Sequence, residues 1–153
     1  MSNAIGVVSL QGFIVEDTIY TYLLAEGATE AAAASVGVAA MTIDTSAANT
    51  LKLAGDGDKI HGILQSYEAR DIEDVAVGAC AKEGSFKFLV NPNIDTSPTQ
   101  LPAVGDYLVG AATDAGVKGY VQKATSTQIS AGKNNWQVFE VATDNSYVIA
   151  MNV

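Results

Sequence analysis

The sequence predicts a mainly β domain, either a barrel or a sandwich, that follows an N-terminal arm. From Gly37 onward, short apolar and β-branched runs alternate with turn residues at regular spacing, as in all-β folds. Residues 1–36 lack this alternation, so we assign them to an arm or lead-in segment. The remaining residues, 37–153, have the length of one domain and bury enough surface to fold without a metal or a disulfide.

The N-terminal arm carries apolar stretches that need a surface to cover them. Residues 5–15 are apolar and suit a strand or an extended segment, and residues 17–24 add further apolar and aromatic side chains. The alanine-rich run at 30–34 favours a helix but is too short to be stable alone. Apolar side chains in such number mark contact surfaces. We therefore assign an interface to this segment, formed by Ile5, Val7, Val8, Leu10, Phe13, Tyr20 and Tyr22.

The domain that follows is predicted to consist of short strands. Each strand is a run of β-branched, aromatic or other apolar residues bounded by polar turn residues. The predicted strands span residues 38–44, 50–54, 60–68, 75–81, 85–91, 106–112, 117–124, 136–142 and 146–153.

Turn residues separate these runs and define the connections. Residues 55–58, Gly-Asp-Gly-Asp, form a tight loop, and Gly84 can adopt positive φ in a hairpin turn. Residues 143–145, Thr-Asp-Asn, connect the last hairpin. In contrast, residues 91–102 hold all three prolines and no apolar period, which predicts a long surface loop.

The composition favours a protein that assembles with other subunits. Charged residues make up only 16% of the chain, and neutral amides and hydroxyls lower the cost of covering its polar surface. The net charge is −9 and the eight Lys and Arg residues are unclustered, so nucleic acid is not an expected partner. No apolar stretch approaches the ~20 residues of a membrane span, and the first residues lack a signal-peptide pattern. We expect a soluble protein, made in a cytoplasm, with no membrane partner.

Candidate catalytic and metal-binding residues are few. Cys80 lies in an apolar run, which indicates a small buried side chain. A catalytic thiolate would need His61 as its base, and nothing in the sequence places the two together. One histidine and one cysteine do not form a zinc site. Asp56 and Asp58 resemble half of a calcium loop, but the spaced oxygen series ending in Glu is absent, so we predict a solvated turn.

Other chemical signatures are weaker. Asp71, Glu73 and Asp74 are neighbouring carboxylates beside Arg70, a pattern that favours a charged loop over the two facing carboxylates of a glycosidase. The chain contains no Gly-x-Ser-x-Gly elbow, no phosphate-binding loop and no dinucleotide fingerprint. We therefore expect a protein that is not an enzyme and that has no metal and no cofactor.

Trp136, the sole tryptophan, has two interpretations. It packs in the core of the last hairpin with Phe139 and Tyr147, or it is an interface hot spot, since aromatic residues dominate both settings. We predict core packing for Trp136 and keep Tyr20 and Tyr22 as the interface residues.

The order of several short segments along the chain resembles that of a known protein family. They are Gly-Val-Ala at 37–39, Thr-Leu-Lys-Leu-Ala-Gly-Asp-Gly-Asp at 50–58, Ile-His-Gly-Ile-Leu at 60–64, Leu-Pro-Ala-Val-Gly-Asp-Tyr-Leu at 101–108 and Gly-Val at 116–117. This order of strands and Gly/Asp turns resembles the small capsid decoration (cement) proteins of tailed bacteriophages. The resemblance covers residues 37–124 and contains no catalytic motif.

The resemblance implies a compact β-barrel or β-tulip-like domain on the outer capsid surface of a virion. It also implies a homotrimer, synthesised in the host cytoplasm, that bridges copies of the major capsid protein and stabilises the shell. The sequence leaves two alternatives open. One is another virion component, such as a tail-tube or head-fibre base protein. The other is a small hydrolase or carbohydrate-binding module on a β-sandwich, for which the carboxylates and Trp136 are the motivation.

Overall fold

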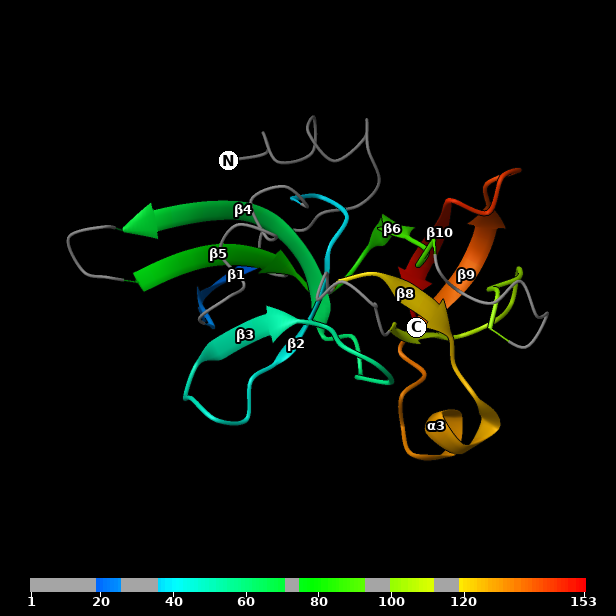
Figure 1. The fold of residues 1–153 in the computed structure, drawn as a ribbon, viewed down its shortest axis with the longest axis horizontal. Helices are drawn as coiled ribbons and strands as arrows, with labels where there is room; N and C mark the ends of the chain where they lie inside the picture. Colours follow the sequence, from blue (N-terminus) through cyan, green and yellow to red (C-terminus); the bar gives the residue numbers. More distant parts are fainter. Residues whose placement is uncertain (1–18, 26–35, 71–74, 93–99, 112–118) are drawn as a thin grey trace, which may run out of the picture.

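The computed structural model of the chain describes residues 19–25, 36–70, 75–92, 100–111 and 119–153. Within these ranges the protein is mainly β and contains a closed barrel, which confirms the predicted fold class (Figure 1). The elements are β1 Ile19–Leu24, β2 Ala40–Ile43, β3 Thr50–Leu53, β4 Gly62–Arg70, β5 Val75–Ala81, β6 Ser85–Leu89, β7 Leu108–Gly110, β8 Val121–Lys123, α3 Ser126–Ser130, β9 Trp136–Val141 and β10 Tyr147–Asn152.

Each strand predicted after residue 37 overlaps an observed strand. The helix α3 was not predicted, because its five residues are too few to show an apolar period. Its local signal is a capping box, in which the Thr125 hydroxyl accepts from the Gln128 backbone N–H and the Gln128 side chain accepts from the Thr125 backbone N–H.

Strands β1 to β5 form a closed barrel in the order β1-β3-β2-β4-β5. β1 closes this barrel, because it pairs antiparallel with β5 from Ile19↔Ala81 to Leu24↔Ala76 and parallel with the start of β3. Closure satisfies the backbone groups of strands that would otherwise lie at an exposed sheet edge.

The position of β1 changes the interpretation of the N-terminal segment. We assigned residues 1–36 to an arm, but Ile19–Leu24 lies in the barrel wall and Leu24 is buried in the barrel core. Local pattern did not reveal this, because the partners of β1 lie far along the chain. Residues 1–18 and 26–35 lie outside the described residues, and so do the assigned interface residues Ile5, Val7, Val8, Leu10 and Phe13.

The remaining five strands surround a second core beside the barrel (Figure 1). β6-β10-β9 and β7-β8 are separate sheets, and the bridges Val90↔Val121 and Tyr107↔Gln137 connect them. Trp136 is fully buried among these strands, with its ring 5.1 Å from that of Phe88. The predicted core role of Trp136 is therefore confirmed.

The companions predicted for Trp136 were wrong. Phe86 and Phe88 contact its ring, whereas Phe139 is 44% exposed and Tyr147 lies beneath the Lys87 ammonium. Side chains alternate along a strand, so Phe139, three residues after Trp136, points to the opposite face of β9.

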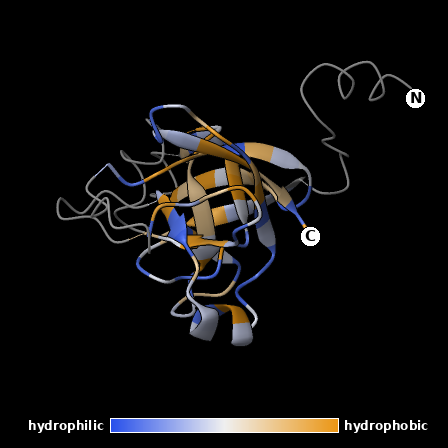
Figure 2. Cartoon of the chain, turned by 90° about the vertical axis from the view of Figure 1, so that its right-hand side faces the viewer, coloured by the Kyte–Doolittle hydropathy of each residue, from blue (hydrophilic) through white to orange (hydrophobic). Residues whose placement is uncertain are grey.

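The two cores share one wall, and each core packs against one face of it. On β2, β4 and β5, Ala40, Ile63 and Ala81 face the second core, while their neighbours Met41, Leu64 and Cys80 face the barrel interior. Both faces are thus buried where these strands carry these six residues, and Figure 2 shows the apolar segments concentrated in the central strands with hydrophilic turns around them.

We expect Gly110→Ala to destabilise the protein. A Cβ at this position would overlap the Gly55 carbonyl oxygen and contact Ala54, and backbone atoms cannot move aside as a flexible side chain can. Overpacking of this kind costs about 1–3 kcal/mol in the free energy of unfolding, measurable by urea denaturation. Gly55→Ala is the matched control, since its Cβ would lie at an ordinary 3.4 Å from the Asp58 carboxylate. Equal denaturation midpoints for the two variants would contradict this packing.

A second prediction concerns barrel closure. Deletion of residues 1–24 removes β1 and exposes the edges of β3 and β5, so we expect a large fall in melting temperature by circular dichroism. Deletion of residues 1–18 leaves β1 in place and serves as the control. If both deletions left the melting temperature unchanged, β1 would not contribute to the stability of the barrel.

Candidate functional site

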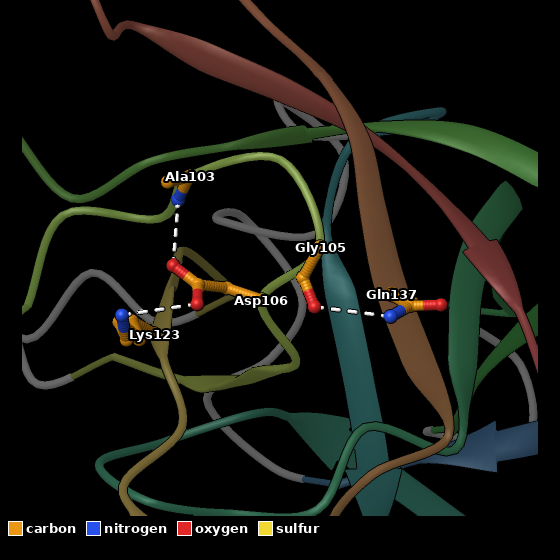
Figure 3. A network of polar contacts seen from close by, with 5 residues as sticks. All are labelled: Ala103, Gly105, Asp106, Lys123 and Gln137. Atoms are coloured by element: carbon orange, nitrogen blue, oxygen red, sulfur yellow. Dashed lines mark hydrogen bonds and ion pairs between the residues drawn. The ribbon is translucent and has the colours of Figure 1, made fainter.

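The segment Leu101–Leu108, which carries part of the resemblance, is a structural turn. The Asp106 carboxylate accepts from the Ala103 backbone N–H at 2.8 Å and forms an ion pair with the Lys123 ammonium at 3.0 Å (Figure 3). The Gly105 carbonyl accepts from the Gln137 side-chain amide at 3.0 Å. These contacts connect the turn to β8 and β9. The turn uses Asp106 for its carboxylate and Gly105 for its positive φ of 93°.

The Gly-Asp-Gly-Asp loop is also structural. The Asp58 carboxylate accepts from the Gly55 N–H, and the Asp56 carboxylate accepts from the Gln122 side-chain amide, both at 2.9 Å. Gly110 then locks this loop to β7, since its carbonyl accepts from Gly57 and its N–H donates to the Asp58 carbonyl. The predicted turn is confirmed. Within the described residues, no group of three or more His, Cys, Asp or Glu side chains is placed to hold a metal ion.

The two motif-bearing loops therefore build the fold. The 55–58 loop is bonded to Gly110 of β7, and the 101–108 turn is bonded to Val138 of β9, so their polar groups are used within the fold. The other carboxylate cluster considered above, Asp71, Glu73 and Asp74, lies outside the described residues.

A cavity of about 280 Å³ opens at one end of the barrel, and we call this end the mouth. His61 and Cys80 both line it, although nothing in the sequence placed them together. Burial raises the pKa of the Cys80 thiol to about 12, so the thiol is protonated at neutral pH. Burial also lowers the pKa of His61, whose Nδ1 lies 3.4 Å from the Thr42 hydroxyl. A protonated thiol beside a neutral imidazole behaves as part of the cavity wall rather than as a nucleophile with its base.

Two tyrosines and a lysine stand at the rim of the mouth. Tyr20 and Tyr22 lie on the same face of β1, with ring centroids 6.4 Å apart, and Tyr20 is 48% exposed. The Lys82 ammonium lies over both rings, 4.5 Å from the centroid of Tyr20 and 5.1 Å from that of Tyr22. The register explains this contact: Tyr20 pairs with Cys80, so Lys82, two residues later, projects on the same face as Cys80.

We define the mouth surface as Tyr20, Tyr22, Ile43 and Lys82. Ile43 at the end of β2 is 49% exposed and lines the same cavity as Tyr22 and Lys82. Of the interface residues predicted from the sequence, Tyr20 and Tyr22 belong to this surface. Ile43 and Lys82 were missed, because only the strand pairing brings them beside β1.

A second cavity, about 450 Å³ in volume, lies between the end of β6 and the β9–β10 turn. Its main acidic group, Asp144, is used within the turn: the carboxylate accepts from the Ser146 hydroxyl at 2.6 Å and from its N–H at 3.0 Å. These hydrogen bonds lower the pKa of the Asp144 carboxyl. The Asp144 carboxylate is therefore engaged within the turn that borders this cavity.

No protein-family model, curated protein or solved structure matches this chain. Among the described residues there is no helix with the length and apolar character that crossing a bilayer requires.

The environment of His61 predicts a pH dependence of stability. Its pKa is lowered in the folded protein from 6.5, chiefly because burial disfavours the charged ring. Below pH 6.5 the unfolded chain binds the proton more readily than the folded chain does, so stability falls as pH decreases through this range. The slope is limited to about 1.4 kcal/mol per pH unit, the value for one proton.

Denaturant unfolding between neutral and mildly acidic pH measures this effect. The His61→Gln variant should lose the slope that the unmodified chain shows below pH 6.5. Parallel pH profiles for the two proteins would show that His61 does not titrate differently on folding.

Proposed function

We propose that this chain is a phage head decoration (cement) protein, not an enzyme. In this role it binds the outer capsid surface as a homotrimer and stabilises the shell by bridging major capsid proteins. The observation that carries the proposal is the mouth surface, where Tyr20, Tyr22 and Ile43 expose apolar area beside the Lys82 ammonium. Partly exposed aromatic side chains of this kind dominate the energetics of protein–protein interfaces.

The side chains of the mouth surface are held in place before any partner binds, which supports a docking role. The Lys82 ammonium holds both tyrosine rings, and Tyr22 packs against the barrel core, so these side chains lose little conformational freedom on binding. Preorganised contacts of modest area suffice for a cement protein, because a closed shell repeats each contact many times.

The chemistry of the rest of the chain is compatible with this proposal. Cys80 is a protonated thiol in the cavity wall, and the carboxylates of Asp56, Asp58 and Asp106 hold turns together. The low fraction of charged residues, 16%, makes the surface inexpensive to desolvate under a neighbouring subunit.

The test is binding of the purified chain to expanded phage capsids that lack a decoration protein. We expect co-sedimentation with the capsids and density on their outer face at threefold positions by electron microscopy. Tyr20→Ser should weaken binding about tenfold, the effect of losing a contact worth about 1.4 kcal/mol. Phe139→Ser, at an aromatic position of similar exposure on β9, is the control and should bind normally.

Two outcomes would refute the decoration role. The first is failure to bind any capsid. The second is formation of tubes when the purified chain is concentrated, which would identify a tail-tube component instead.

A further inference from the structure

We infer that the mouth cavity is a binding pocket for one apolar side chain of a protein partner, with a carboxylate of the same segment paired to Lys82. This inference rests on the proposed docking role of the mouth surface and adds the chemistry of the partner. It makes the mouth a pocket of defined specificity rather than a flat patch.

The size of the cavity suits a side chain. Its volume of about 280 Å³ falls just below the range of about 300–1,000 Å³ that is typical of sites for drug-sized ligands and cofactors. Leu51 and Cys80 are buried residues that line it, and Tyr22 and Ile43 line it closer to solvent. Because the Cys80 thiol carries no charge at neutral pH, these four residues form an apolar part of the lining that can receive an aliphatic or aromatic side chain, and Asn49, Thr50 and His61 add polar groups to it.

The charge of the pocket residues determines which charge on the partner segment is favoured beside its apolar side chain. Among the described residues that line the cavity there is no Asp or Glu, and Lys82 supplies a positive charge at the rim. His61 adds no charge at neutral pH, since burial lowers its pKa further below 6.5. The local sign is therefore opposite to that of the whole chain, whose net charge is −9. The negative net charge of the whole chain attracts a basic segment, but the positive charge at the mouth favours an acidic segment there.

The position of Lys82 fits a carboxylate partner. Its ammonium lies over the rings of Tyr20 and Tyr22, an arrangement that orders the side chain. The ring contacts are made through the ring faces, and an ammonium has three N–H donors, so donors remain for a carboxylate. Such a charge-assisted bond forms beside the pocket that receives the apolar side chain.

The experiment uses the full ¹⁵N-labelled chain and blocked dipeptides as probes. Acetyl-Phe-Glu-amide carries both features, acetyl-Phe-Gln-amide lacks the charge and acetyl-Ala-Glu-amide lacks the large apolar group. We expect saturable chemical-shift changes at Tyr22, Ile43 and His61 with acetyl-Phe-Glu-amide in a millimolar titration. The uncharged probe should bind about threefold to fivefold more weakly, the effect of one partly exposed ion pair. The alanine probe should produce no saturable shifts.

Three variants separate the pocket from nonspecific binding. Lys82→Met keeps the side-chain stem and should make the two phenylalanine probes bind equally. Ile43→Glu places a like charge at the pocket and should abolish binding of acetyl-Phe-Glu-amide. Val104→Glu changes an exposed residue outside the cavity lining and is the control that should bind normally. The fold of each variant is checked in its own ¹H–¹⁵N spectrum.

Several results would overturn the inference. These are shifts at residues other than those of the mouth, equal binding of the charged and uncharged probes to the unmodified chain, and no saturable shift at all. The capsid experiment distinguishes this failure from failure of the decoration role. Capsid binding that survives both Lys82→Met and Ile43→Glu would leave the proposed function intact and refute the pocket as its docking site.

Discussion

The structure depends on one wall, formed by parts of three strands, that is buried on both faces. β2, β4 and β5 alternate between residues that line the barrel and residues that pack against the Trp136 core. Such a wall requires small side chains at its closest approaches. At Gly62, for example, a Cβ would lie only 2.5 Å from the Ala81 carbonyl oxygen and from the Cys80 sulfur. Small apolar residues and a low aromatic content, 7% of the chain, suit this geometry.

Close backbone packing also explains what the Gly/Asp turns do in the fold. The loop at 55–58 and the strand β7 approach so closely that Gly110 has no room for a Cβ, and backbone hydrogen bonds join them. The aspartates of this loop and of the 101–108 turn accept hydrogen bonds from nearby backbone or side-chain donors. The loop at 55–58 and the turn at 101–108 thus act as connections within the fold.

At the mouth, one face of β1 runs from the barrel core to the exposed mouth surface. Leu24, Tyr22 and Tyr20 share a face of β1, and their exposure increases from 7% at Leu24 to 48% at Tyr20. The aromatic rings therefore extend the barrel core outward, and Lys82 covers them where the protein meets water. Side chains that continue a packed core are held by it, which suits the proposed docking role.

The sequence by itself determined the β class, the approximate positions of the strands after residue 37 and the burial of Trp136 and Cys80. These features follow from local alternation, turn residues and hydrophobicity. The tertiary structure alone decided that β1 closes the barrel, that Phe139 faces away from Trp136's core, and that Tyr22, His61, Cys80 and Lys82 meet at one cavity. The reason is that strand partners are chosen by packing between segments distant in the chain, which short-range pattern does not encode.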